Sequence, residues 1–155
     1  MSVRKATAAD AEDIRAVILE AVESNRQDDL DELGWEFFYK QVEIDAIVDR
    51  ISDGIHFTLC HFERDVMTGI ITMRHMERIA QLFVRSDQRK KGVAGQLWQE
   101  AKRICIDEAG TKTFMVYSSS MAIPVYQSFG FFKAGDRFTR NGVSCTPMEL
   151  NIDAP

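Results

Sequence analysis

A run of three basic residues followed by two glycines is the part of this sequence best suited to chemistry. Arg89, Lys90 and Lys91 place positive charge directly before Gly92, and apolar residues then recur at helical spacing. We therefore expect a helix to begin near Gly92 with its first backbone N–H groups unpaired, at the end where the helix dipole is positive. Because Gly92 and Gly95 have no Cβ, an anion can lie directly against the main chain. The combination predicts a phosphate site, although an ordinary solvated basic loop would contain the same residues.

Hydrophobic periodicity predicts the elements that position this turn. We expect strands at 3–6, 55–62, 66–74, 75–84, 114–117, 131–138 and 144–152, and helices at 7–22, 44–51, 92–109 and 122–129. The three strands between residues 55 and 84 are expected to form an antiparallel meander, and Asn141-Gly142 predicts a final hairpin. This order indicates an α/β or α+β fold, with a mixed, mostly antiparallel sheet of about seven strands and helices on both faces.

Residues 24–36 are polar and acidic, and we expect them to form a loop or a short helical turn. The acidic residues that cluster here are Asp28, Asp29, Asp31 and Glu32. A solvated surface segment is the simpler interpretation, and a lid that carries negative charge toward a bound amine is the alternative. The aromatic residues Trp35, Phe37, Phe38 and Tyr39 are expected to anchor this segment to the core, and a wall of the acceptor pocket is the alternative.

Composition restricts the function classes. The chain of 155 residues suffices for one domain, which we place at 1–155. Its net charge of -5 argues against nucleic-acid binding, and no apolar run is long enough to cross a membrane. Cys60, Cys105 and Cys145 form no Cys-x-x-Cys pair, so we expect reduced thiols in the cytoplasm rather than disulfides or a zinc site. The histidines also lack metal-ligand spacing, and we expect no metal.

The sequence does not match the motifs of three other functional classes. The chain has no Gly-x-x-x-x-Gly-Lys-Ser/Thr loop of the kind that binds nucleoside triphosphates. The run from Gly92 to Gly95 lacks the Gly-x-Gly-x-x-Gly spacing of a dinucleotide site. A cysteine hydrolase is disfavoured because no cysteine has a plausible charged partner in the sequence.

Two motifs together resemble the GCN5-related N-acetyltransferase (GNAT) family. The first, after a strand, matches the family's acetyl-CoA signature, and the second follows downstream at the family's spacing. The matching residues are Arg89-x-x-Gly92-x-Ala94 and Ala122-x-x-x-Tyr126-x-x-x-Gly130-Phe131. The predicted order of strands and helices fits the family fold over nearly the whole chain.

The resemblance implies an N-acetyltransferase that uses acetyl-CoA and a primary amine, on a small molecule or a peptide, in a ternary complex. Strand residues would pair with the pantetheine arm, and N–H groups of the turn would hold the pyrophosphate. Tyr126 would act as the general acid that protonates the leaving thiolate. The implied cofactor-binding residues are Leu82, Phe83, Val84, Arg89, Lys90, Lys91, Gly92, Val93, Ala94, Gly95, Ser119 and Tyr126.

Three positions depart from the family pattern. Arg78 stands where some relatives carry a glutamate, so the general base stays open among Glu77, Gln81 and a water relay. Ser119 replaces an asparagine, which would trim cofactor affinity by roughly 1 kcal/mol. Ser86 replaces a proline and is expected to loosen the turn slightly.

These departures motivate a second hypothesis, a non-catalytic acyl-CoA-binding or regulatory module with the same fold. A longer acyl donor than acetyl also stays open. Because family members often form homodimers, a homodimer that uses the Asn141-Gly142 hairpin is compatible with this sequence.

Overall fold

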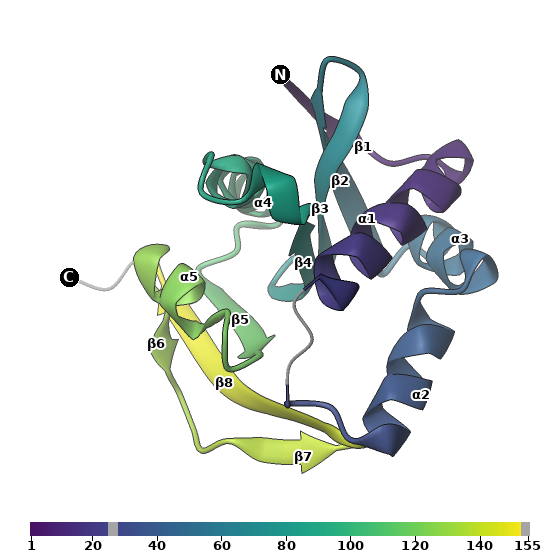
Figure 1. Ribbon diagram of the computed structural model, residues 1–155. Coiled ribbons are helices and arrows are strands. Elements are labelled where there is room, and N and C mark those ends of the chain that lie inside the picture. The colour runs from purple at the N-terminus through teal and green to yellow at the C-terminus, as the bar shows by residue number, and fades with distance from the viewer. Residues whose placement is uncertain (25–27, 153–155) are drawn as a thin grey trace.

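A single mixed sheet runs through the molecule, with helices on both of its faces (Figure 1). The structure is a computed structural model that describes residues 1–24 and 28–152. Within these residues the sheet has eight strands, in the order β1-β2-β3-β4-β5-β8-β6, with β7 paired to β8. The strands are β1 Ser2–Lys5, β2 His56–Glu63, β3 Val66–Arg74, β4 Arg78–Val84, β5 Thr113–Ser118, β6 Phe132–Lys133, β7 Phe138–Arg140 and β8 Val143–Asn151. The predicted fold class is confirmed, with eight strands rather than about seven.

The helices form two layers around the sheet (Figure 1). They are α1 Ala11–Glu23, α2 Glu32–Gln41, α3 Ile44–Ser52, α4 Val93–Ala109 and α5 Ile123–Ser128, with short 3-10 turns η1 Ala8–Asp10 and η2 Ser86–Gln88. One apolar core lies between the sheet and α4, where Trp98 meets Phe114 edge-on with ring centres 5.1 Å apart. The other lies between the sheet and α1 and α3. Neighbouring residues Ile70 and Ile71 of β3 contribute to opposite cores, as alternation along a strand requires.

β4 and β5 diverge soon after they meet, and this divergence positions the site described below. They pair in parallel only at Arg78 with Met115 and at Ile79 with Val116. On its other side β4 stays paired with β3 up to Val84, with a bulge at Ala80. From residue 81 onward, the edge of β4 that faces β5 therefore has no partner strand in the described part of the chain (Figure 1).

Two sequence predictions need correction. The strand predicted at 131–138 is two short strands, β6 and β7, because the chain leaves β8 at Pro147, which has no N–H to continue the ladder. The segment predicted as a loop or a short helical turn at 24–36 contains the start of a longer helix, α2, at Glu32, and its residues 25–27 lie outside the described residues. The Asp31 carboxylate caps this helix by accepting a hydrogen bond from the Gly34 N–H at 2.9 Å.

Gly34 in α2 and Gly142 in the β7–β8 hairpin lie in close contact. An ideal Cβ on Gly34 would lie 2.2 Å from the carbonyl oxygen of Gly142, and one on Gly142 would lie 2.3 Å from the Gly34 nitrogen. The backbone N–H of Asp31 also donates to the Gly142 carbonyl at 3.0 Å. The start of α2 thus lies directly against the backbone of the hairpin, with the Asp31 side chain also close to Gly142.

The buried cysteines and the described helices do not indicate a cellular compartment. Cys60 and Cys105 are free and buried, and burial raises the pKa of each thiol to about 12, so both stay protonated. None of the described helices is both long and apolar enough to span a bilayer.

The start of α1 depends on the carboxylate of Asp10. Its two oxygens accept hydrogen bonds from Arg4 at 2.8 and 2.9 Å, and one of them also accepts from the Thr7 N–H at 2.8 Å. The Arg4 hydrogen bonds are the largest of the effects that lower the pKa of Asp10 to about 2. Since this pKa is below that of the unfolded chain, the carboxylate stabilises the fold above about pH 4, and the contribution is lost as pH falls through about 2.

We therefore expect Asp10→Asn to lower the free energy of unfolding at pH 7 by about 1–2 kcal/mol. Urea unfolding of both proteins at pH 7 and at pH 2.5 measures this difference. The gap between wild type and variant should shrink at the lower pH, and an equal gap at both values would contradict the assignment.

Candidate active site

A cavity of about 610 Å³ opens where β4 and β5 diverge. Its walls come from α2, β4, β5, α5 and the start of β8, so residues far apart in the sequence meet here. Leu82 and Phe83 line it from β4, Ser119 from the turn after β5 and Tyr126 from α5. We refer to this cavity as the β4–β5 cleft.

The turn before α4 presents backbone N–H groups that the protein itself does not use. Across the described residues, no group accepts a hydrogen bond from the N–H of residues 89–95. Gly92 adopts φ +84°, a left-handed conformation that favours glycine, and an added Cβ on Gly92 or Gly95 would meet open space. Lys90 and Lys91 are exposed beside it. These features fit a phosphate group at the positive end of a helix.

The turn at residues 89–95, which we refer to as the phosphate turn, is anchored to α1 together with η2 before it. The Ser86 N–H donates to the Glu20 carboxylate at 2.9 Å, and its hydroxyl donates to the same carboxylate. The guanidinium of Arg89 donates to the carbonyl of Ala21 at 2.9 Å. Ser86 therefore ties the turn to α1, whereas the sequence predicted that it would loosen it, and the Arg89 side chain supports the turn from behind.

Tyr126 lies at the inner wall of the β4–β5 cleft. Its side chain is 6% exposed and packs edge-on against Phe129 and Phe131, with ring centres 6.2 and 5.8 Å away. Burial raises the pKa of this phenol above its usual value of about 10, so it is neutral at pH 7. No described residue forms a hydrogen bond with its hydroxyl. The arrangement can deliver a proton to an atom bound in the cleft.

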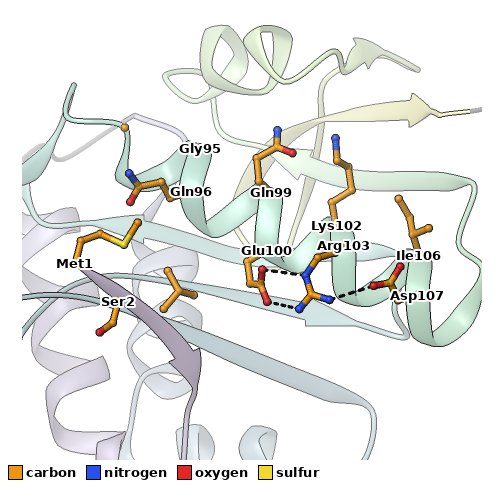
Figure 2. Close-up of a pocket in the computed structure, with 12 residues that line it drawn as sticks. Met1, Ser2, Gly95, Gln96, Gln99, Glu100, Lys102, Arg103, Ile106 and Asp107 are labelled. Atoms are coloured by element: carbon orange, nitrogen blue, oxygen red, sulfur yellow. Dashed lines mark hydrogen bonds and ion pairs between the residues drawn. The ribbon is translucent and has the colours of Figure 1, made fainter.

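A second, broader hollow of about 1270 Å³ lies between β1 and α4 (Figure 2). The Arg103 side chain there donates to Glu100 at 3.1 Å and to Asp107 at 3.0 Å, so these charges are paired along the exposed face of α4. Because its charged groups neutralise one another, this hollow offers less chemistry than the β4–β5 cleft. No group of three or more metal-ligating side chains occurs within the described ranges.

Comparison with known families agrees with this geometry. A family model described as an acetyltransferase (GNAT) domain matches residues 22–152. The chain belongs to the GNAT family of acetyltransferases. A UPF0039 protein of Schizosaccharomyces pombe is 33% identical over 76 residues, which are 48% of this chain and 51% of that protein. The match thus spans about half the length of that relative.

Solved GNAT structures share the fold over nearly the whole chain. A GCN5-related N-acetyltransferase from Rhodopseudomonas palustris superposes with a TM-score of 0.84 at 19% identity, covering 97% of this chain and 94% of that one. The PaiA N-acetyltransferase from Thermoplasma acidophilum, solved in complex with coenzyme A, gives 0.78 at 16% identity, covering 97% and 98%. At sequence identities of 19% and 16%, this structural similarity establishes the fold.

In this GNAT domain the predicted residues divide into two adjoining groups. The phosphate turn holds Arg89 to Gly95. The β4–β5 cleft holds Leu82, Phe83, Ser119 and Tyr126. Val84 continues β4 toward the turn and packs against the core. Of the candidate bases, Gln81 lines the cleft whereas the exposed Glu77 lies in the β3–β4 turn.

The sequence did not single out Asp29 from its acidic neighbours, yet the GNAT domain buries this carboxylate, which is 3% exposed. It accepts hydrogen bonds from the Ser120 hydroxyl at 2.6 Å, the Ser120 N–H at 3.1 Å and Arg137 at 3.0 Å. Burial by itself would raise the pKa of Asp29, but these hydrogen bonds outweigh it and hold the pKa below the usual value. The carboxylate thus joins the segment before α2 to the far wall of the cleft.

The GNAT cleft also contains two arginines and a histidine that the sequence analysis did not assign to a site. Arg50, Arg74 and His56 line it. The only sequence signal for His56 and Arg74 is the spacing of the strands, which makes them register partners, and Arg50 on α3 has no such signal.

Proposed function

We propose that this protein transfers the acetyl group of acetyl-CoA to a primary amine by direct attack within a ternary complex. The observation that carries the proposal is the set of unused N–H groups at residues 89–95, beside an open β4 edge. The turn would hold the pyrophosphate, and the backbone of Leu82 to Val84 would pair with the pantetheine arm as a further strand. The thioester would then lie in the β4–β5 cleft near Tyr126.

In the proposed reaction the nitrogen lone pair of the amine attacks the thioester carbonyl carbon. The carbon–sulfur bond then breaks, and its electron pair leaves with the sulfur. Tyr126 gives its proton to this thiolate, since a neutral phenol in an apolar site can neutralise developing charge. The phenolate regains a proton from solvent when coenzyme A leaves.

Removal of the proton from the attacking amine is assigned to water. Gln81 faces the cleft, but its Oε1 accepts a hydrogen bond from the Thr72 hydroxyl at 3.1 Å, and an amide is not a base at neutral pH. Asp29 is the one carboxylate among the described residues that line the cleft, and Ser120 and Arg137 occupy its oxygens. A water relay agrees with both observations.

A thiol-release assay tests the proposal. Purified protein would be incubated with acetyl-CoA and a panel of primary amines, and free coenzyme A would be measured with a thiol reagent. Release that depends on the amine, with the acetylated amine identified by mass spectrometry, is the expected result. Stoichiometric binding of acetyl-CoA without turnover of any amine would instead support the non-catalytic module. Longer acyl-CoA donors in the same assay would define the acyl preference.

A further inference from the structure

Three positively charged or basic side chains form a row across the sheet at one end of the β4–β5 cleft. His56 of β2 is the register partner of Arg74 in β3, and Arg74 is the register partner of Arg78 in β4. Register partners in antiparallel strands project from the same face, about 5 Å apart at Cβ. All three line the cleft. We refer to this set as the arginine row.

The arginine row is separate from the phosphate turn. Arg78 begins β4, whereas the turn follows Val84 at the other end of the strand. At about 3.3 Å per residue, β4 places them about 20 Å apart. If the thioester lies between them, as the proposed function requires, the row faces the amine and not the phosphates of coenzyme A.

The two arginines of the row have no anionic partner among the described residues. The Nε atom of Arg74 is enclosed and has no hydrogen-bond acceptor among the described residues. Arg78 lies over the Tyr117 ring, 5.4 Å from its centre, and forms no ion pair with any residue in the described ranges. A partly buried guanidinium group without an anion is unfavourable, so it gains from a ligand that supplies one.

Other groups around the cleft do not neutralise this charge. The Asp29 carboxylate is bound by Arg137 and Ser120, and the Asp53 carboxylate pairs with His56 at 2.7 Å and with neither arginine of the row. Arg50 adds a further cation to the wall, where its guanidinium donates to Gln41. The acceptor side of the cleft is therefore positive, in contrast to the acidic lid considered from the sequence.

We propose that the acceptor amine carries an oxyanion group, a carboxylate or a phosphate, that binds Arg74 and Arg78. The planar fork of a guanidinium matches both groups through paired N–H···O hydrogen bonds. The hydroxyls of Thr58 and Thr72 and the amide of Gln81 form a hydrogen-bonded line from β2 to β4, with distances of 2.7 and 3.1 Å, beside the row. These polar groups would lie along the acceptor between the arginine row and the thioester. The inference rests on the proposed acetyl transfer.

Matched pairs of amines test the inference by thiol release. Each pair differs only in the oxyanion: β-alanine against β-alaninamide for the carboxylate, and phosphoethanolamine against ethanolamine for the phosphate, with spermidine as a cationic amine. We expect kcat/KM to be about 10- to 100-fold higher for the charged member of at least one pair. The pair with the larger ratio identifies the oxyanion. Equal or better turnover of the neutral and cationic amines would overturn the inference but leave acetyl transfer intact.

Variants of the row show whether it causes the preference. Arg74→Gln should raise KM for the charged amine about 10- to 100-fold and leave its neutral partner unchanged. Arg74→Lys should raise KM for the charged amine less than Arg74→Gln does, because an ammonium keeps the charge but lacks the planar pair of N–H donors of a guanidinium. Arg15→Gln, which removes the same charge from the exposed face of α1, should leave the preference as it is. Equal losses on both members of a pair in Arg74→Gln would contradict the assignment.

Binding measurements separate failure of this inference from failure of the proposed function. If coenzyme A binds but no amine is acetylated, the row can still be tested by titrating the CoA-loaded protein with N-acetyl-β-alanine and its amide, and with N-acetylphosphoethanolamine and N-acetylethanolamine. Tighter binding of the charged member of at least one pair in the wild type, lost in Arg74→Gln, supports the inference. Equal affinity within both pairs overturns it.

Discussion

Tyr126→Phe is expected to lower kcat by about 10²- to 10⁴-fold, the range in which a positioned general acid contributes to a rate. The phenol lines the β4–β5 cleft, and burial raises its pKa, so it carries its proton throughout the neutral range. Phenylalanine keeps the ring contacts with Phe129 and Phe131 but cannot give a proton to the leaving thiolate. Steady-state thiol release against a saturating amine measures the loss.

Stability and cofactor affinity serve as controls for the Tyr126→Phe variant. No described residue forms a hydrogen bond with the Tyr126 hydroxyl, so removing it leaves no group unsatisfied. The melting temperature and the dissociation constant of coenzyme A should therefore stay close to those of the wild type. A variant that retains kcat within threefold, with normal cofactor binding, would remove Tyr126 from the mechanism.

Ala94→Glu is expected to weaken coenzyme A binding more than 100-fold. The residue occupies the first turn of α4, directly behind the N–H groups that would hold the pyrophosphate. A carboxylate about 5 Å from a phosphate charge costs about 3 kcal/mol at an effective dielectric constant of about 20. Isothermal titration with coenzyme A measures the change in the dissociation constant.

The same substitution should not harm folding. A glutamate in the first turn interacts favourably with the helix dipole, so the melting temperature should be unchanged or slightly higher. Ala94→Gln adds the same bulk without the charge and should lie between Ala94→Glu and the wild type. Ala94→Gly, which removes only a methyl group, should bind coenzyme A within a few-fold of wild type. Normal binding by Ala94→Glu would place the pyrophosphate elsewhere.

The predictions from the sequence that succeeded rest on local patterns. The apolar spacing after Gly92 predicted α4, and Asn141-Gly142 predicted the β7–β8 hairpin, where both residues have positive φ. Each depends on a few neighbouring residues. The turn between β4 and α4 could be predicted for the same reason, because a strand, a glycine and a helix start are contiguous in the chain. Its role as a phosphate site stays a prediction.

The predictions that failed required contacts between distant segments. The start of α2 is stabilised by its approach to the β7–β8 hairpin, and the single strand predicted at 131–138 is divided by its pairing partner Pro147. Likewise the arginine row is created by the register of three strands, which hydrophobic alternation alone does not fix. The family resemblance implied acetyl-CoA, but the sequence could not predict that Arg74 and Arg78 both line the cleft.

The contact between Gly34 and Gly142 has a consequence for comparing homologues. A methyl group at either position would overlap the backbone of the other segment, so a chain that keeps one glycine and loses the other must separate α2 from the hairpin. Both segments belong to the wall of the β4–β5 cleft. Paired glycines in an alignment would therefore mark the relatives that preserve this wall, and their joint loss would mark relatives whose acceptor has a different shape.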